Sequence, residues 1–109
     1  MELLEEMNRL KTLLNTALTE FKARGTTYAK AYANYRKLLA QELLILKAEG
    51  MPVTIAYDIA RGKEAIANAK EQEIIAETLY KSCQEAINSY KLQMKILQEQ
   101  IEKEYHNEI

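Results

Sequence analysis

Positive charge and tyrosine are concentrated in one acid-free segment of the first half of the chain. Between Glu20 and Glu42 there is no Asp or Glu, and the segment contains Lys22, Arg24, Tyr28, Lys30, Tyr32, Tyr35, Arg36 and Lys37. Guanidinium and ammonium groups bind phosphate, and tyrosine rings offer flat surfaces on which nucleobases stack. The segment therefore predicts a site for an anionic nucleotide. Its candidate ligand-binding residues are Arg24, Tyr28, Tyr32 and Arg36.

The same segment also fits a second interpretation, in which it is an ordinary helical surface. Apart from Arg24, the basic residues of the segment fall on outer heptad positions, namely Lys22, Lys30, Arg36 and Lys37. Tyr28 and Tyr35 fall on the apolar seam. On this interpretation the cations form a solvated face and the tyrosines pack in the core.

Two charged residues, Arg24 and Glu73, occupy seam positions that are otherwise apolar. A charge in such a position must form an ion pair, bind an ion or reach solvent along its own stem. For Glu73 we predict an ion pair with Arg36. Arg24 has no acidic residue near it in the expected register, so we expect either a contact with another subunit or a bound anion.

A second candidate for anion binding is the sequence Arg61-Gly62-Lys63, at the expected start of the second long helix. Backbone amides at a helix N-terminus favour negative charge, and the two cations flank them. Arg61 and Lys63 therefore join the candidate ligand-binding residues. A simple junction between two helices explains the same three residues without a ligand.

Residues for catalysis or metal binding are scarce. The single histidine, His106, lies near the C-terminus, far from any Ser or Cys in the expected arrangement. The single cysteine, Cys83, lies on the seam as a structural thiol and cannot form an internal disulfide. Glu71, Glu73 and Glu77 lack the histidines that helical carboxylate metal sites use. We therefore expect no enzymatic activity, no cofactor and no metal.

The candidate residues must be positioned by helices, because apolar residues recur in steps of three and four in two long stretches. These run from Leu3 to Leu38 and from Ile66 to Ile101 and resemble coiled-coil seams. Between them lie Gly50 and Pro52, which favour the end of a helix, and Thr54, which is expected to cap the next one. The prediction is one all-α domain with a long helix over about 2–48, a turn over 49–54, a short helix over about 55–61 and a long helix over about 63–105.

The two long helices are expected to pair as an antiparallel hairpin. A second apolar face, made of Ile74, Ile75, Leu92 and Ile96, predicts assembly into a homo-oligomeric helical bundle. Gly25 lies inside the first long helix, where glycine costs about 1 kcal/mol relative to alanine. It favours a kink, the close approach of another group or simply a weaker helix.

Composition limits the classes of protein to consider. A chain of 109 residues with 48% hydrophobic and 28% charged residues is typical of one soluble folded domain. Its net charge of −1 argues against non-specific nucleic-acid binding. No apolar run approaches the roughly 20 residues that cross a bilayer, and the first residues are acidic rather than basic, so we expect a cytoplasmic protein without a membrane partner.

A resemblance to known proteins lies in two stretches of the sequence. They are the hinge string EGMPVTIAYDIARG (Glu49 to Gly62) and the string LYKSCQEAINSYKLQMKILQEQI (Leu79 to Ile101). The chain resembles a group of small helical proteins of phages and prophages of Gram-positive bacteria, for which no activity is implied. In size, helical design and its basic-tyrosine segment it also resembles phage proteins that sequester cyclic nucleotide signals of host immunity.

Two functions follow from these observations. In the first, a helical oligomer of a phage accessory protein binds a phosphorylated or cyclic nucleotide without cleaving it and acts as an anti-defence sponge in the host cytoplasm. In the second, the chain is an interaction or scaffolding module that inhibits a host protein or assists recombination or replication. The first uses the basic residues, and the second uses the second apolar face.

Overall fold

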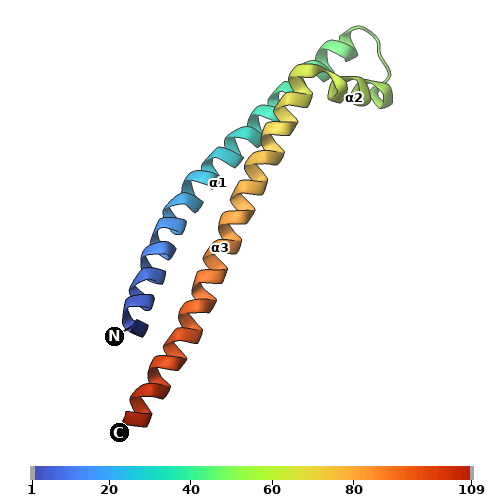
Figure 1. Cartoon of the computed structure of the whole chain (residues 1–109). Coiled ribbons are helices and arrows are strands. Elements are labelled where there is room, and N and C mark those ends of the chain that lie inside the picture. Colours follow the sequence, from blue (N-terminus) through green and yellow to red (C-terminus); the bar gives the residue numbers. More distant parts are fainter. Residues whose placement is uncertain (1, 109) are drawn as a thin grey trace. The chain divides into compact units, whose positions relative to one another are not determined.

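The computed structural model describes residues 2–108, which form three α-helices and no strand. Helix α1 spans Glu2–Ala48, α2 spans Val53–Gly62 and α3 spans Glu64–Glu108 (Figure 1). The expected all-α fold class is confirmed. Within this described range, none of the helices combines the length and the apolar character that a membrane span requires.

Helix α1 ends in a hydrogen-bonded cap that the glycine makes possible. Gly50 has a φ of 84°, the left-handed conformation that residues with a Cβ rarely adopt. The Gly50 amide donates to the carbonyl of Lys47 at 3.0 Å, and the Met51 amide donates to the carbonyl of Leu46 at 3.1 Å. This pair of bonds is the Schellman motif, and its apolar contact is present because Met51 packs against the core that contains Leu46.

Helix α2 starts earlier than the sequence predicts. Its N-cap is Pro52, whose carbonyl accepts from the amides of Ile55 and Ala56 at 3.1 and 2.9 Å, and no side chain caps the helix. The prediction that Thr54 is the N-cap is therefore wrong. The fixed φ of proline, here −59°, already suits the residue that precedes a helix, so the chain turns into α2 before it reaches Thr54.

A single residue, Lys63, joins α2 to α3. Its backbone is extended, its amide donates to the carbonyl of Ala60 at 3.2 Å, and its own carbonyl accepts from the amides of Ile66 and Ala67. Gly62 is the last residue of α2 rather than part of a turn. The chain therefore changes direction at Lys63 without a loop.

The contacts divide the described residues into two units, residues 24–80 and residues 2–23 with 81–108. The first unit holds the end of α1, all of α2 and the beginning of α3. Its core takes residues from all three helices: Tyr35, Leu39, Leu46, Ala56, Ala60, Ile66 and Ala69. Ala60 has no exposed surface, so its small side chain lets α2 lie directly on its neighbours.

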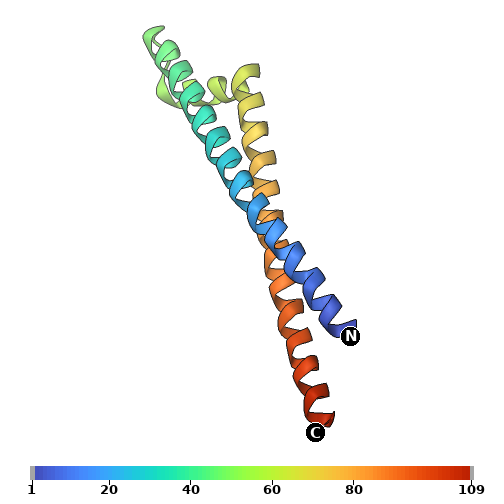
Figure 2. The same cartoon turned by 90° about the vertical axis from the view of Figure 1, so that its left-hand side faces the viewer.

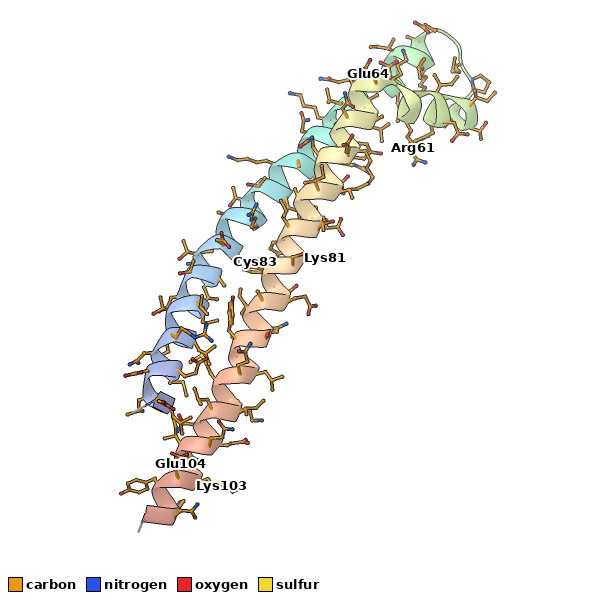
Figure 3. The ribbon with its side chains drawn as sticks, in the orientation of Figure 1. Arg61, Glu64, Lys81, Cys83, Lys103 and Glu104 are labelled. Carbon is orange, nitrogen blue, oxygen red and sulfur yellow. The ribbon has the colours of Figure 1, made fainter. Side chains whose placement is uncertain are left out.

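The second unit pairs the beginning of α1 with the end of α3, which run in opposite directions (Figures 1 and 2). Its core is formed by Met7, Leu10 and Leu97, with Tyr90 and Met94 packed against it. Cys83 extends from α3 toward α1 (Figure 3), where its thiol donates a hydrogen bond to the Ala17 carbonyl at 3.3 Å. Cys83 thus has the structural role expected from its seam position.

The two hinge glycines should respond to alanine in opposite directions. At Gly50 a Cβ would be forced into left-handed geometry, so we expect Gly50→Ala to lower the free energy of unfolding by about 1 to 2 kcal/mol. Gly62 has helical geometry and open space around it, so Gly62→Ala should stabilise the chain by up to about 1 kcal/mol. Chemical denaturation of both variants checks this pair. An unchanged midpoint for Gly50→Ala would contradict the role given to the cap.

Candidate functional site

Helix α2 supplies two faces to the first unit, and one of them builds a cavity. Ala56 and Ala60, four residues apart, point into the core. Tyr57 and Arg61, also four residues apart, lie on the neighbouring face. They line a cavity of about 490 Å³ together with residues of α1 and α3. We call this the basic cavity; its lining is Tyr32, Tyr35, Arg36, Leu39, Tyr57, Arg61, Lys70 and Glu73.

Helical spacing explains why these side chains share one cavity. On α1 the lining residues follow each other at intervals of three, one and three, which keeps them on one face of the helix. On α3 Lys70 and Glu73 are three residues apart and also share a face. Figure 3 shows Arg61 extending from α2 on the side where the first turns of α3 lie.

Two of the three cations of the basic cavity lie over its tyrosine rings. The guanidinium carbon of Arg61 lies 5.4 Å from the centre of the Tyr57 ring, and the Lys70 ammonium lies 4.8 Å from the centre of the Tyr35 ring. Cation–π contacts of this kind hold a charge in place without neutralising it. Arg36 and Arg61 form no ion pair with any carboxylate among residues 2–108.

Glu73 is the one carboxylate that lines the basic cavity, and its partner differs from the prediction. It is 4% exposed, and its Oε2 accepts from the Lys70 ammonium at 2.9 Å. This bond raises the pKa of Lys70. The predicted pair with Arg36 is wrong, because Lys70 lies one turn from Glu73 on the same helix and reaches it first. Arg36 is therefore left available in the cavity.

A second hollow adjoins the basic cavity on α3. It has a volume of about 580 Å³ and is lined by Tyr35, Arg61, Ala67, Lys70, Glu71, Ile74 and Ile75. Tyr35, Arg61 and Lys70 line both spaces. The two cations are thus within reach of a ligand in either space, and Ile74 and Ile75 give the second hollow an apolar side.

A third, smaller hollow explains the glycine inside α1. It has a volume of about 320 Å³ and is lined by Gly25, Tyr28, Ala29, Tyr32 and Tyr80. A Cβ on Gly25 would lie 3.2 Å from Cε2 of Tyr80, so the missing side chain makes room for that ring. The Tyr28 and Tyr80 rings lie 5.8 Å apart at 39°, and the Tyr28 hydroxyl is 3.3 Å from Oε2 of Glu77. Close approach is therefore the reason for glycine here.

A double-mutant cycle tests this explanation of Gly25. In a Tyr80→Ala background we expect Gly25→Ala to stabilise the chain by about 1 kcal/mol, the usual helix-propensity gain. With Tyr80 in place the added methyl must displace the ring, so the gain should fall by about 0.5 to 1.5 kcal/mol. Denaturation of the four proteins gives the coupling energy. A coupling of zero would mean that the contact does not constrain Gly25.

The six predicted ligand-binding residues are brought together only in part. Tyr32, Arg36 and Arg61 line the basic cavity. Tyr28 lines the third hollow, and Tyr32 lines both the third hollow and the basic cavity. Arg24 is half-buried, lines none of these three spaces and forms no ion pair with another residue of the described chain.

Lys63 lines none of the three spaces either, because it is engaged elsewhere. Its ammonium pairs with Oε1 of Glu42 at 2.5 Å, which raises the pKa of Lys63. Glu42 lies on α1, so this ion pair ties the junction between α2 and α3 to the end of the first helix. Lys63 therefore serves the hinge rather than the cavity.

Sequence reasoning missed Tyr57 and Lys70, and it assigned Tyr35 to the core alone. Tyr35 is 8% exposed and does pack in the core, yet it also lines the basic cavity. One signal for Tyr57 was available: it lies four residues before Arg61, on the same face of a short helix. Lys70 also had a signal, because it lies three residues before Glu73 on the same helix and could pair with it.

The site offers binding chemistry. Within the described residues there is no cluster of three or more His, Cys, Asp or Glu side chains that could hold a metal ion. The lining of the basic cavity combines three cations, one carboxylate that is bonded to a cation, and three tyrosines. Such a set can hold an anion with a flat ring system attached.

Comparison of the chain with models of protein families, with curated proteins and with solved structures found no match.

Proposed function

We propose that this chain is a non-enzymatic binding protein that holds a phosphorylated nucleotide in the basic cavity. The observation that carries the proposal is the pair Arg36 and Arg61, which come from different helices, line one cavity and have no carboxylate partner among residues 2–108. Two guanidiniums that share a space repel each other, and a bound phosphate removes that repulsion. A phosphate is therefore the ligand group that best satisfies them.

The rest of the lining supports a nucleotide rather than a bare anion. Tyr32, Tyr35 and Tyr57 provide aromatic surface beside the cations, and base–aromatic stacking contributes about 1 to 3 kcal/mol per base. The volume of about 490 Å³ lies in the range of roughly 300 to 1,000 Å³ that small-molecule sites occupy. Binding without cleavage is supported because the described residues that line the basic cavity include no His, Ser or Cys side chain.

The biological setting of the proposal comes from the resemblance to phage proteins. In that setting the chain is a phage accessory protein of the host cytoplasm that sequesters a nucleotide signal of host immunity. The proposal includes the hairpin arrangement of the two long helices and a homo-oligomer. Exposed apolar side chains on α3, such as Ile74 at 52% and Leu92 at 58%, support self-association, because monomeric proteins rarely leave large apolar surfaces exposed to water.

The same exposed side chains favour a second candidate function. Ile74, Ile75, Leu92 and Ile96 are all at least 44% exposed, so they are available to a different protein as well as to another copy. On this alternative the chain is an interaction module that inhibits or scaffolds a host or phage protein. Its basic cavity would then be only a surface feature.

Native mass spectrometry distinguishes the two candidates. The full chain is measured as purified and after mixing with ATP, GTP, cyclic AMP and cyclic dinucleotides. The first candidate predicts discrete nucleotide adducts that survive desolvation and a stabilised thermal transition. A chain that gains no adduct from any of these nucleotides, yet captures one protein in stoichiometric amount, would reject the first candidate in favour of the second.

A further inference from the structure

Glu73 has a feature that the proposed function does not use. Its Oε2 is bonded to the Lys70 ammonium, but its Oε1 has no hydrogen-bond partner among the described residues. The side chain is only 6% exposed, and Oε1 is not one of the fully enclosed polar atoms. Glu73 lines the basic cavity. A carboxylate oxygen without a partner therefore belongs to a side chain in the wall of the space where the ligand would sit.

A negative acceptor in a cavity for anions needs an explanation. It lowers the affinity for any phosphate by repulsion, and Arg36 and Arg61 bind phosphate without it. A ligand that fills the cavity displaces the water at Oε1, and a carboxylate oxygen left without a donor is costly. A ligand that presents an N–H or O–H group to Oε1 avoids that cost. The carboxylate thus discriminates between ligands by the donors they carry.

We propose that Glu73 is a specificity-determining residue that accepts a hydrogen bond from a donor on the nucleotide. This inference rests on the proposed function and adds the chemical class of the ligand: a phosphorylated nucleoside with a hydrogen-bond donor on its sugar or its base. Two groups have this chemistry, a ribose hydroxyl and an exocyclic amine of the base. Carboxylates accept from ribose hydroxyls in dinucleotide-binding folds by the same principle.

Two sets of probes distinguish these donors. The adenosine set is ATP, 2′-deoxyATP, 3′-deoxyATP and purine riboside triphosphate, which lacks the amine. The guanosine set is GTP, its two deoxy forms and ITP, which also lacks the amine. Dissociation constants are measured by calorimetry for the wild-type chain. We expect the loss of one donor to weaken binding about tenfold or more, since an unsatisfied carboxylate is responsible.

The variant Glu73→Met removes the acceptor and keeps the volume of the side chain. It also makes the cavity more positive, so affinity should rise for the donor-free probes, and the ratio between a probe and its donor-free analogue should fall to about one. A structural role for Glu73 would not move that ratio. Thermal melts confirm folding, and Glu73→Gln serves as a second variant, in which the ratio falls because a neutral carbonyl is a weaker acceptor.

The outcomes separate this inference from the proposed function. Wild-type chain that binds all members of a set with equal affinity would overturn the role of Glu73 while the proposed function stands. A ratio that is unchanged in Glu73→Met would also overturn it. Failure of the wild-type chain to bind any probe would overturn both. A loss confined to the deoxy probes assigns the donor to the sugar, and a loss confined to the amine-free probes assigns it to the base.

Discussion

Arg61→Gln is expected to weaken nucleotide binding about 10- to 100-fold, with little change in the thermal transition. Charge-assisted hydrogen bonds are about twice as strong as neutral ones, and a guanidinium can make two of them to one phosphate. Arg61 lines both the basic cavity and the adjoining hollow on α3, so its loss affects a ligand in either space. Calorimetry with ATP and GTP measures the change. Arg61 contacts the Tyr57 ring and forms no ion pair with the described residues, so the fold should tolerate the substitution.

Lys63→Gln is the matched control for this prediction. It removes the same charge two residues further along the chain, and Lys63 lines none of the three spaces described above. Because Lys63 pairs with Glu42 at the junction, a thermal melt of the variant must show that the fold is kept. We expect the affinity to change by less than about threefold, because only the net charge of the chain is altered. This difference in affinity should become smaller still when salt is added. Equal losses in the two variants would show diffuse electrostatic attraction instead of a site. No loss in either would place binding elsewhere.

The helical class of this protein was accessible from the sequence because it depends on local patterns. Steps of three and four between apolar residues predict helices without knowledge of what they pack against. The end of α1 was equally local, since Gly50 takes the left-handed conformation and Pro52 follows it. The start of α2 was missed because two residues compete for the cap, and the fixed geometry of Pro52 prevails over the hydroxyl of Thr54.

The candidate site was less accessible, because its residues come from three helices. Tyr32 and Arg36 were found from the acid-free segment of α1, and Arg61 from the charged junction. Their shared cavity depends on the angle at Lys63, which no periodicity encodes. Lys70 lies one turn from Glu73 on α3, so the ion pair expected between Glu73 and Arg36 went to this closer partner. The contact of Lys70 with the Tyr35 ring of α1, in contrast, depends on how the helices pack.

The charge of Arg24 shows what sequence patterns alone leave open. Its seam position suggested an ion pair, an anion or a contact with another subunit. The structure shows Arg24 half-buried and, within the described residues, without an ion pair. Because Arg24 is only half-buried, its stem can carry the charge to solvent. The expected anion or contact with another subunit stays a prediction.

Leu10→Ala should be the most destabilising of the substitutions considered, with a loss of about 2 to 5 kcal/mol in the free energy of unfolding. Leu10 is 2% exposed and is the largest fully buried side chain of the described residues. It belongs to a cluster of three buried residues, with Met7 and Leu97. So small a core has few neighbours that can move into the space left by a leucine. Urea denaturation at fixed protein concentration measures the loss.

Leu4→Ala makes the same chemical change on the same helix at a position that is 48% exposed. For a single chain the expected loss is below about 1 kcal/mol, because alanine gains slightly in helix propensity and little buried surface is given up. A loss as large as that of Leu10→Ala would contradict burial within one chain as the source of stability. Such a loss, if it also grew on dilution of the protein, would show that another copy covers Leu4 in solution. The comparison of the two leucines therefore measures how much of the stability of this unit belongs to one chain and how much to its association.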